Sequence, residues 1–154
     1  MKRLPLLETA LGILAPVPAM LVAVAVLFPA PAVAEPGKAK LTVTVTNITE
    51  HKGVLQVAVY DAAGYDTDKV AAADSVAVTA GTATATFDLP AGQYGIKMFH
   101  DVNGDGKMGT NPFGMPTEPF AFSNNAPAQF GPATWDAAKF DVPAGGATQT
   151  IKLQ

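Results

Sequence analysis

The chain has 154 residues, a length typical of one domain. It carries 10 Lys and Arg residues against 13 Asp and Glu residues, so its formal charge is −3, and this acidic balance argues against a nucleic-acid partner, which would require a basic face. The absence of cysteine excludes disulfide bonds, thiol catalysis and thiolate metal sites.

Residues 1–34 have the features of a secretory signal peptide. Lys2 and Arg3 give a positive start, LVAVAVLF at 21–28 is a continuous apolar core, and an Ala-Val-Ala pattern ending at Ala34 suits signal peptidase. Prolines interrupt the apolar run, which is shorter than the roughly 20 residues that a membrane-spanning helix needs. We therefore expect cleavage after Ala34 and a periplasmic or secreted bacterial protein with no membrane span. A retained N-terminal anchor is the alternative.

The remaining residues, 35–154, are predicted to form a single β-sandwich domain with a formal charge of −4. LTVTVTN at 41–47 places Leu and Val on one face and Thr on the other, which is the period of a half-buried strand. GVLQVAVY at 53–60 repeats the pattern. Because only a short polar segment joins these two strands, they are predicted to form a hairpin.

Further along the chain, short strands alternate with turn residues. Residues 61–74 break the alternation and are predicted to form a loop with one turn of helix near 69–73. Residues 101–134 are rich in Gly, Pro and Asn, and a loop of this length in a small domain is usually functional or disordered. The other predicted elements are strands at 75–80, 82–89, 93–100 and 147–153 and a helix-to-strand segment at 135–142. About seven short strands with little helix predict an all-β, antiparallel β-sandwich with one long ordered loop.

The segment after the fifth predicted strand contains HDVNGDGKMGTN at 100–111, FGMPTEPFAFSNNA at 113–126 and GPATWDAAKF at 131–140. In order and spacing, these pieces resemble the bacterial family catalogued as domain of unknown function 2141, and the resemblance covers nearly the whole of the predicted mature chain. It implies an exported immunoglobulin-like or transthyretin-like sandwich, and it implies no known reaction. Gly109 departs from the family, which commonly has Asp there, so one carboxylate is missing from the loop.

The start of the long loop has the residue types of a calcium site. Calcium takes about six to eight oxygen ligands. Asp101, Asn103 and Asp105 supply three side-chain oxygens at alternate positions, and the carbonyl of Lys107 can be a fourth ligand. An EF-hand is excluded, because its twelfth position requires Glu and is Pro112 here.

A loop of a sandwich can take its missing carboxylate from another segment. Glu118 is the nearest candidate in the sequence, with three aspartates of the other long loop as rivals. The alternative is a plain turn in which Asp101 and Asn103 cap backbone amides and the neighbouring glycines take positive φ. A transition metal at His100 is a weaker alternative, because the chain has one other histidine, His51, and no thiolate. The rival carboxylates are Asp61, Asp66 and Asp68.

The same loop suggests an enzymatic alternative, a hydrolase that uses His100, Asp101 and Glu118 at the loop mouth. Ser123 is a poor nucleophile candidate, because no Gly-x-Ser-x-Gly elbow surrounds it. We expect Ser123 and the two asparagines after it to bond the loop backbone instead.

Five aromatic residues fall within the long loop or just after it. They could form a platform for sugars or peptides, or a satellite core that holds the loop against the sandwich. We favour the core, because an ordered loop of this length needs burial to offset its entropy. The five residues are Phe113, Phe120, Phe122, Phe130 and Trp135.

The sequence thus predicts an exported cell-envelope or periplasmic module with a binding or structural role, rather than an enzyme. Its working surface would be the loop at 100–126, with calcium as the one candidate cofactor. The expected partner is an envelope component, a peptide or a saccharide. The hydrolase remains the alternative.

Overall fold

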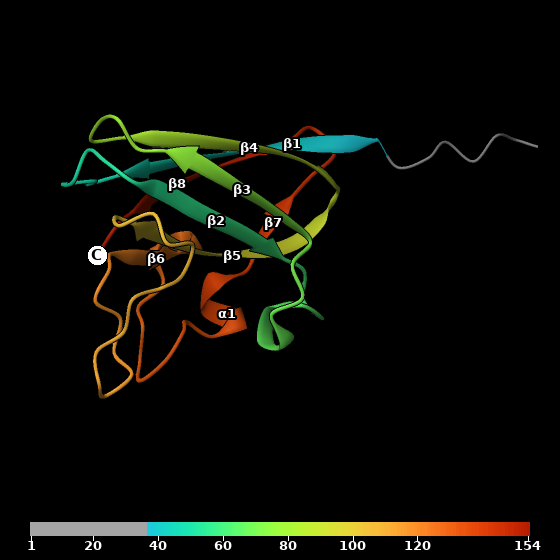
Figure 1. The fold of residues 1–154 in the computed structure, drawn as a ribbon. Coiled ribbons are helices and arrows are strands. Elements are labelled where there is room, and N and C mark those ends of the chain that lie inside the picture. The colour runs from blue at the N-terminus through green and yellow to red at the C-terminus, as the bar shows by residue number, and fades with distance from the viewer. Residues whose placement is uncertain (1–36) are drawn as a thin grey trace, which may run out of the picture. The chain divides into compact units, whose positions relative to one another are not determined.

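The computed structural model describes residues 37–154, which fold into two packed β-sheets (Figure 1). The predicted signal peptide lies outside the described residues. One sheet has the strand order β4-β1-β8, and the other has the order β3-β2-β5-β6, with β7 pairing with another part of β5. The elements are β1 (Lys38–Thr46), β2 (Val54–Tyr60), η1 (Tyr65–Thr67), β3 (Ala72–Ala77), β4 (Ala83–Pro90), β5 (Gly92–Asp101), β6 (Phe120–Phe122), η2 (Ser123–Asn125), α1 (Trp135–Ala138), β7 (Phe140–Val142) and β8 (Ala147–Lys152).

This architecture confirms the predicted all-β sandwich and adds one strand that the sequence did not indicate. The additional strand, β6, lies inside the segment predicted to be an irregular loop. It forms because Phe120, Ala121 and Phe122 pair with the middle of β5. One pairing also differs from an antiparallel sandwich, since β1 and β8 are parallel.

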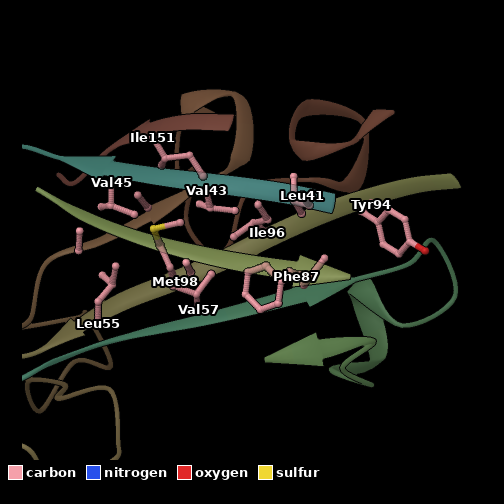
Figure 2. Close-up of a cluster of buried hydrophobic side chains, with 14 of the residues drawn as sticks. Leu41, Val43, Val45, Leu55, Val57, Phe87, Tyr94, Ile96, Met98 and Ile151 are labelled. Atoms are coloured by element: carbon pink, nitrogen blue, oxygen red, sulfur yellow. The ribbon is translucent and has the colours of Figure 1, made fainter. Parts of the chain in front are cut away.

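The core between the sheets follows from the alternation in the strands. Leu41, Val43 and Val45 of β1 are fully buried, while the threonines between them face outward. The opposite sheet contributes Leu55 and Ile96, and Figure 2 shows these apolar side chains meeting between the two layers. Each fully buried Val, Leu or Ile side chain contributes about 1.5–3 kcal/mol, so this layer is the main source of stability.

The predicted hairpin between the first two strands is wrong, because β1 and β2 belong to different sheets. The connecting segment leaves β1 through Asn47, which has a left-handed backbone with φ of 65°. The side-chain amide of Asn47 donates to the backbone carbonyl of Leu153 at 2.9 Å, and Ile48 is buried at the edge of the core. These contacts direct the chain across to the second sheet instead of back along the first.

The predicted helical turn near 69–73 is also wrong. A 3-10 turn lies earlier, at η1, and residue Ala72 already begins β3. The position of η1 is fixed by Tyr65, which is 1% exposed and whose hydroxyl donates to the carbonyl of Ala133 at 3.0 Å. Burial of this ring outweighs the helix propensity of the alanines that follow.

A second apolar cluster lies on the outer face of the five-stranded sheet. Tyr65 packs against Tyr60 and Trp135, with ring centroids 5.9 and 5.5 Å apart. Gly95 makes this packing feasible, because a Cβ atom there would lie 2.7 Å from the Tyr65 ring. The remaining members are Phe122, Ala126, Ala133 and Ala138, with Ala58 and Phe120 packed against them.

Ser123 joins three elements beneath this cluster. Its fully buried hydroxyl accepts from the amide of Ile96 at 2.9 Å and donates to the carbonyl of Ala138. The neighbouring Asn124 donates to the carbonyls of Ala137 and Lys139. The Ser-Asn-Asn segment therefore bonds backbone groups as predicted, but these groups belong to β5 and to α1 and its C-terminal neighbour rather than to the long loop.

We expect Ser123→Ala to reduce the free energy of unfolding by about 1–3 kcal/mol, because it leaves a buried amide and a buried carbonyl without their partner. Ser75→Ala is the matched control. Its hydroxyl is exposed, so the expected loss is below about 0.5 kcal/mol. Urea denaturation of both variants measures the difference, and equal losses would contradict the assigned role.

Candidate functional site

Asp101 organises the start of the long loop. Asp101 is the last residue of β5 and is 1% exposed. One carboxylate oxygen accepts from the amides of Gly104 and Asp105 at 2.7 and 3.1 Å, and the other accepts from Gly106 at 2.8 Å. One carboxylate therefore satisfies three consecutive backbone N–H groups, which gives the turn a single geometry.

The next two polar side chains of the motif repeat this role on a smaller scale. The Asn103 carbonyl oxygen accepts from the amide of Asp105 at 3.0 Å, and the Asp105 carboxylate accepts from the amide of Lys107 at 2.8 Å. The backbone φ angles of Gly104 and Gly106 are 74° and 77°, values that residues with a Cβ atom rarely adopt. The expected capping of the turn and the positive φ of both glycines are confirmed.

Glu118 fastens the far end of the loop to its beginning. Its two carboxylate oxygens accept from the amides of Val102 and Gly109 at 3.0 and 2.8 Å. Gly109 lies directly against this segment, where a Cβ atom would be 2.7 Å from the hydroxyl oxygen of Thr117. The side chain that the sequence suggested as an additional metal ligand thus bridges two parts of the backbone.

In this arrangement, the side chains proposed as calcium ligands are bonded to the backbone of the loop. The carboxylates of Asp101, Asp105 and Glu118 all accept backbone N–H groups, and Glu118 bonds amides outside the turn that Asp101 caps. Within residues 37–154, no group of three or more acidic or histidine side chains is arranged to hold a metal ion. Of the rival carboxylates, Asp61 caps Gly64 and Asp68 binds Lys97. Calcium binding stays a prediction of the sequence.

Two of the candidate catalytic groups, His100 and Asp101, are buried. His100 is fully buried, and its Nε2 lies 2.7 Å from the carbonyl oxygen of Lys52. Within the described part of the chain, its Nδ1 has no partner. His100 faces the core side of β5, and Asp101, the next residue, is occupied by the turn amides. His100 thus links β5 to the segment that precedes β2.

A different site lies on the outer face of the five-stranded sheet. The strand registers place Gln56 beside Phe99 and Phe99 beside Phe120 in one row across the sheet. The next row contains Ala58, Lys97 and Phe122. These two rows form the floor of a groove of about 930 Å³. The outer face of a sandwich sheet usually presents polar side chains to solvent, whereas these two rows are mostly apolar.

Two segments of the long loop form the walls of this groove. Figure 1 shows them projecting on the same side of the molecule, beyond β6. Phe113 and Met115 lie on the first segment and are 88% and 56% exposed, and Phe130 on the second is fully exposed. The expectation of a satellite core therefore holds for Phe122 and for the partly buried Phe120 and Trp135, and it is wrong for Phe113 and Phe130. The groove is also lined by Met108, Gly114, Pro116, Ala128, Gly131 and Pro132.

Lys97 lies in the groove lining, next to the aromatic cluster of Tyr60 and Tyr65. Its ammonium group is 2.7 Å from both the carbonyl oxygen of Tyr65 and the carboxylate of Asp68, and it lies over the rings of Tyr60 and Tyr65. The pKa of Tyr65 is raised to about 12, mainly by burial and to a smaller extent by the charge of Asp66 and by the neighbouring Tyr60. Burial, followed by the charge of Asp68, also raises the pKa of Tyr60. Both hydroxyls thus stay protonated at neutral pH.

The sequence reasoning identified the loop aromatics but missed the groove floor. Tyr60, Lys97 and Phe99 occupy strand positions opposite to those that face the core. The sequence did contain an indication of this floor, because the two large aromatic residues Tyr60 and Phe99 on the outer face of a sandwich indicate that another segment covers that face. The covering by loop segments distant in sequence could not be read from strand periodicity.

We expect Asp101→Ala to lower the free energy of unfolding by about 3 kcal/mol, since three amides lose a charged acceptor. Asp105→Ala is the control. It removes an exposed carboxylate from the same turn, and the expected loss is below about 1 kcal/mol. Chemical denaturation followed by circular dichroism measures both values, and a larger loss in the Asp105 variant would contradict the central role of Asp101.

Comparison with known proteins supports the resemblance drawn from the loop motifs. No curated protein and no solved structure matches this chain. Residues 43–152, well over half of the chain, match the family described as "Uncharacterized protein conserved in bacteria (DUF2141)". This range includes the capped turn, Glu118 and the groove. The chain therefore belongs to the DUF2141 family.

Proposed function

We propose that residues 35–154 form an exported binding module that takes up an apolar ligand in the groove on its five-stranded sheet. The observation that carries the proposal is the combination of an apolar groove with exposed aromatic side chains on both of its walls. Phe113 is 88% exposed and Phe130 is fully exposed. Exposed apolar side chains gathered around one concave surface are typical of a ligand-binding or interaction site.

The groove walls are held in place before any ligand arrives. The first wall is fastened at its base by Asp101 and Glu118, which together accept five backbone N–H groups. The second wall leads towards α1 through Ala133, whose carbonyl accepts the hydroxyl of Tyr65. A preformed site loses little entropy on binding, which favours affinity.

The composition of the groove favours an apolar ligand over a saccharide. Saccharide recognition requires several hydrogen-bonding side chains, and the lining offers Gln56, Tyr60 and Lys97 among mostly apolar residues. Lys97 is already bound to Asp68 and to the carbonyl of Tyr65. The predicted classes of partner, an envelope component, a peptide or a saccharide, are thus narrowed to those with an apolar surface.

Export is part of this proposal and is supported by the signal-like segment at 1–34. No helix within residues 37–154 is long and apolar enough to cross a membrane. We propose cleavage after Ala34 and a periplasmic or secreted location.

A hydrolase is the weaker proposal. His100 and Asp101 are 0% and 1% exposed, and both carboxylate oxygens of Glu118 bond backbone amides. None of the three lines the groove. A general base must reach the proton that it abstracts, and these groups are turned towards the protein.

We expect the double variant Phe113→Ser/Phe130→Ser to weaken binding of the neutral fluorescent probe N-phenyl-1-naphthylamine by about tenfold or more. Each exposed ring contributes about 1 kcal/mol when the ligand covers it. The melting temperature should stay unchanged, because neither ring is buried. Fluorescence titration and thermal denaturation provide the two readouts.

Val70→Ser is the matched control for this experiment. Val70 is 45% exposed and does not line the groove, so its replacement should leave probe binding unchanged. Absence of probe binding to the native protein, or equal binding by the native and double-variant proteins, would contradict the proposed function.

A further inference from the structure

We infer that the ligand is an uncharged apolar molecule with one hydrogen-bond acceptor oxygen, and that the hydroxyl of Tyr60 donates to this oxygen. This inference rests on the proposed function, because it names the chemistry of the ligand that the groove takes up. The supporting observations are an accessible hydroxyl that no described residue accepts, the charge balance of the lining and the position of Tyr60 at one end of it.

Tyr60 differs from the other two tyrosines of the chain. The hydroxyl of Tyr65 donates to the carbonyl of Ala133 at 3.0 Å, and the hydroxyl of Tyr94 donates to the carbonyl of Pro90 at 2.9 Å. Tyr60 is 7% exposed and lines the groove, yet no residue in the range 37–154 accepts its hydroxyl. Among the described residues, the Tyr60 hydroxyl is not one of the buried polar atoms that lack a partner, so its oxygen is accessible from the groove and can donate to a group bound there.

The hydroxyl of Tyr60 offers a donor proton. Burial and the charge of Asp68 both raise the pKa of Tyr60, so the phenol stays protonated at neutral pH. The ammonium of Lys97 lies 4.9 Å from the centre of the Tyr60 ring and discourages a cationic group at this end. The hydroxyl is thus suited to a carbonyl, ether or hydroxyl oxygen of the ligand.

The charge balance of the groove favours a ligand without a formal charge. No acidic residue lines the groove, and Lys97 is the single charged residue in its lining. The Lys97 ammonium is occupied by Asp68 and the Tyr65 carbonyl. A carboxylate on the ligand would have to compete with Asp68, and an ammonium would be repelled by Lys97, so both charged forms lose free energy on desolvation.

The shape of the site places the acceptor oxygen at one end of the ligand. Tyr60 lies at one end of the lining, where its ring packs against Tyr65, and Tyr65 in turn packs against Trp135. The floor continues from Ala58 to Phe99 and Phe120 and offers an apolar surface for the rest of the molecule. The ligand therefore enters with its polar end towards Tyr60 and its apolar body between the loop walls.

Three naphthalene derivatives of similar shape test this inference on the native protein. They are 2-acetylnaphthalene, which carries a carbonyl acceptor, 2-ethylnaphthalene, which carries none, and the anion 2-naphthoate. Displacement of N-phenyl-1-naphthylamine measures each dissociation constant. We expect 2-acetylnaphthalene to bind about tenfold more tightly than 2-ethylnaphthalene, which is the preference that one hydrogen bond provides. It should also bind more tightly than 2-naphthoate, whose charge must be desolvated.

Tyr60→Phe removes the hydroxyl and keeps the ring. We expect this variant to lose the tenfold preference for 2-acetylnaphthalene while it binds 2-ethylnaphthalene as the native protein does. Tyr94→Phe is the matched control, because its hydroxyl bonds Pro90 outside the groove and its removal should keep the preference. Thermal denaturation checks that both variants fold.

The outcomes separate the inference from the proposed function. If the preference persists in Tyr60→Phe, or if 2-naphthoate binds most tightly to the native protein, the inference is overturned while the groove remains a binding site. If no member of the series binds and the fluorescent probe does not bind either, the proposed function itself fails.

Discussion

The carboxylate of Asp101 is the contact on which the rest of the site depends. It lies at the end of β5 and accepts three consecutive amides of the turn that follows. A long segment without regular structure must satisfy its backbone polar groups, or it pays the cost of burying them unpaired. Asp101 does this at the first turn, and Glu118 completes it by bonding Val102 and Gly109. Short side chains thereby replace the hydrogen bonds that a strand or helix would have supplied.

The ordered loop in turn allows the five-stranded sheet to present an apolar outer face. A sandwich normally shows polar residues there, but β2, β5 and β6 place Ala58, Phe99 and Phe120 on this side. At one end of the face, Tyr65 and Trp135 cover the sheet where Gly95 leaves room for them. At the other end, the loop walls stand on either side of the face and leave a groove between them. One part of the sheet face is thus covered by packing, and the other part carries the proposed binding groove.

Much of the sandwich could be predicted, because period-2 alternation directly reports which face of a strand is buried. The β1 and β2 strands were placed correctly in the sequence, but their pairing was not, since alternation contains no information on which strand is the neighbour. At the candidate site, the side-chain caps of Asp101 and Asn103 were predictable because they are local. The role of Glu118, the short strand β6 and the groove depend on contacts between residues distant in sequence. Composition alone could not separate the buried Phe122 from the exposed Phe130.

We propose that the loop is held by its own carboxylates and presents the groove without help from a metal ion. Amide hydrogen exchange of Gly104, Asp105 and Gly106, measured by NMR in EDTA and again in millimolar calcium, tests this claim most directly. The account predicts that all three amides are protected in EDTA, because they donate to Asp101, and that calcium leaves their exchange unchanged. Free exchange in EDTA together with strong protection in calcium would contradict it and would establish the calcium site that the sequence motif suggests.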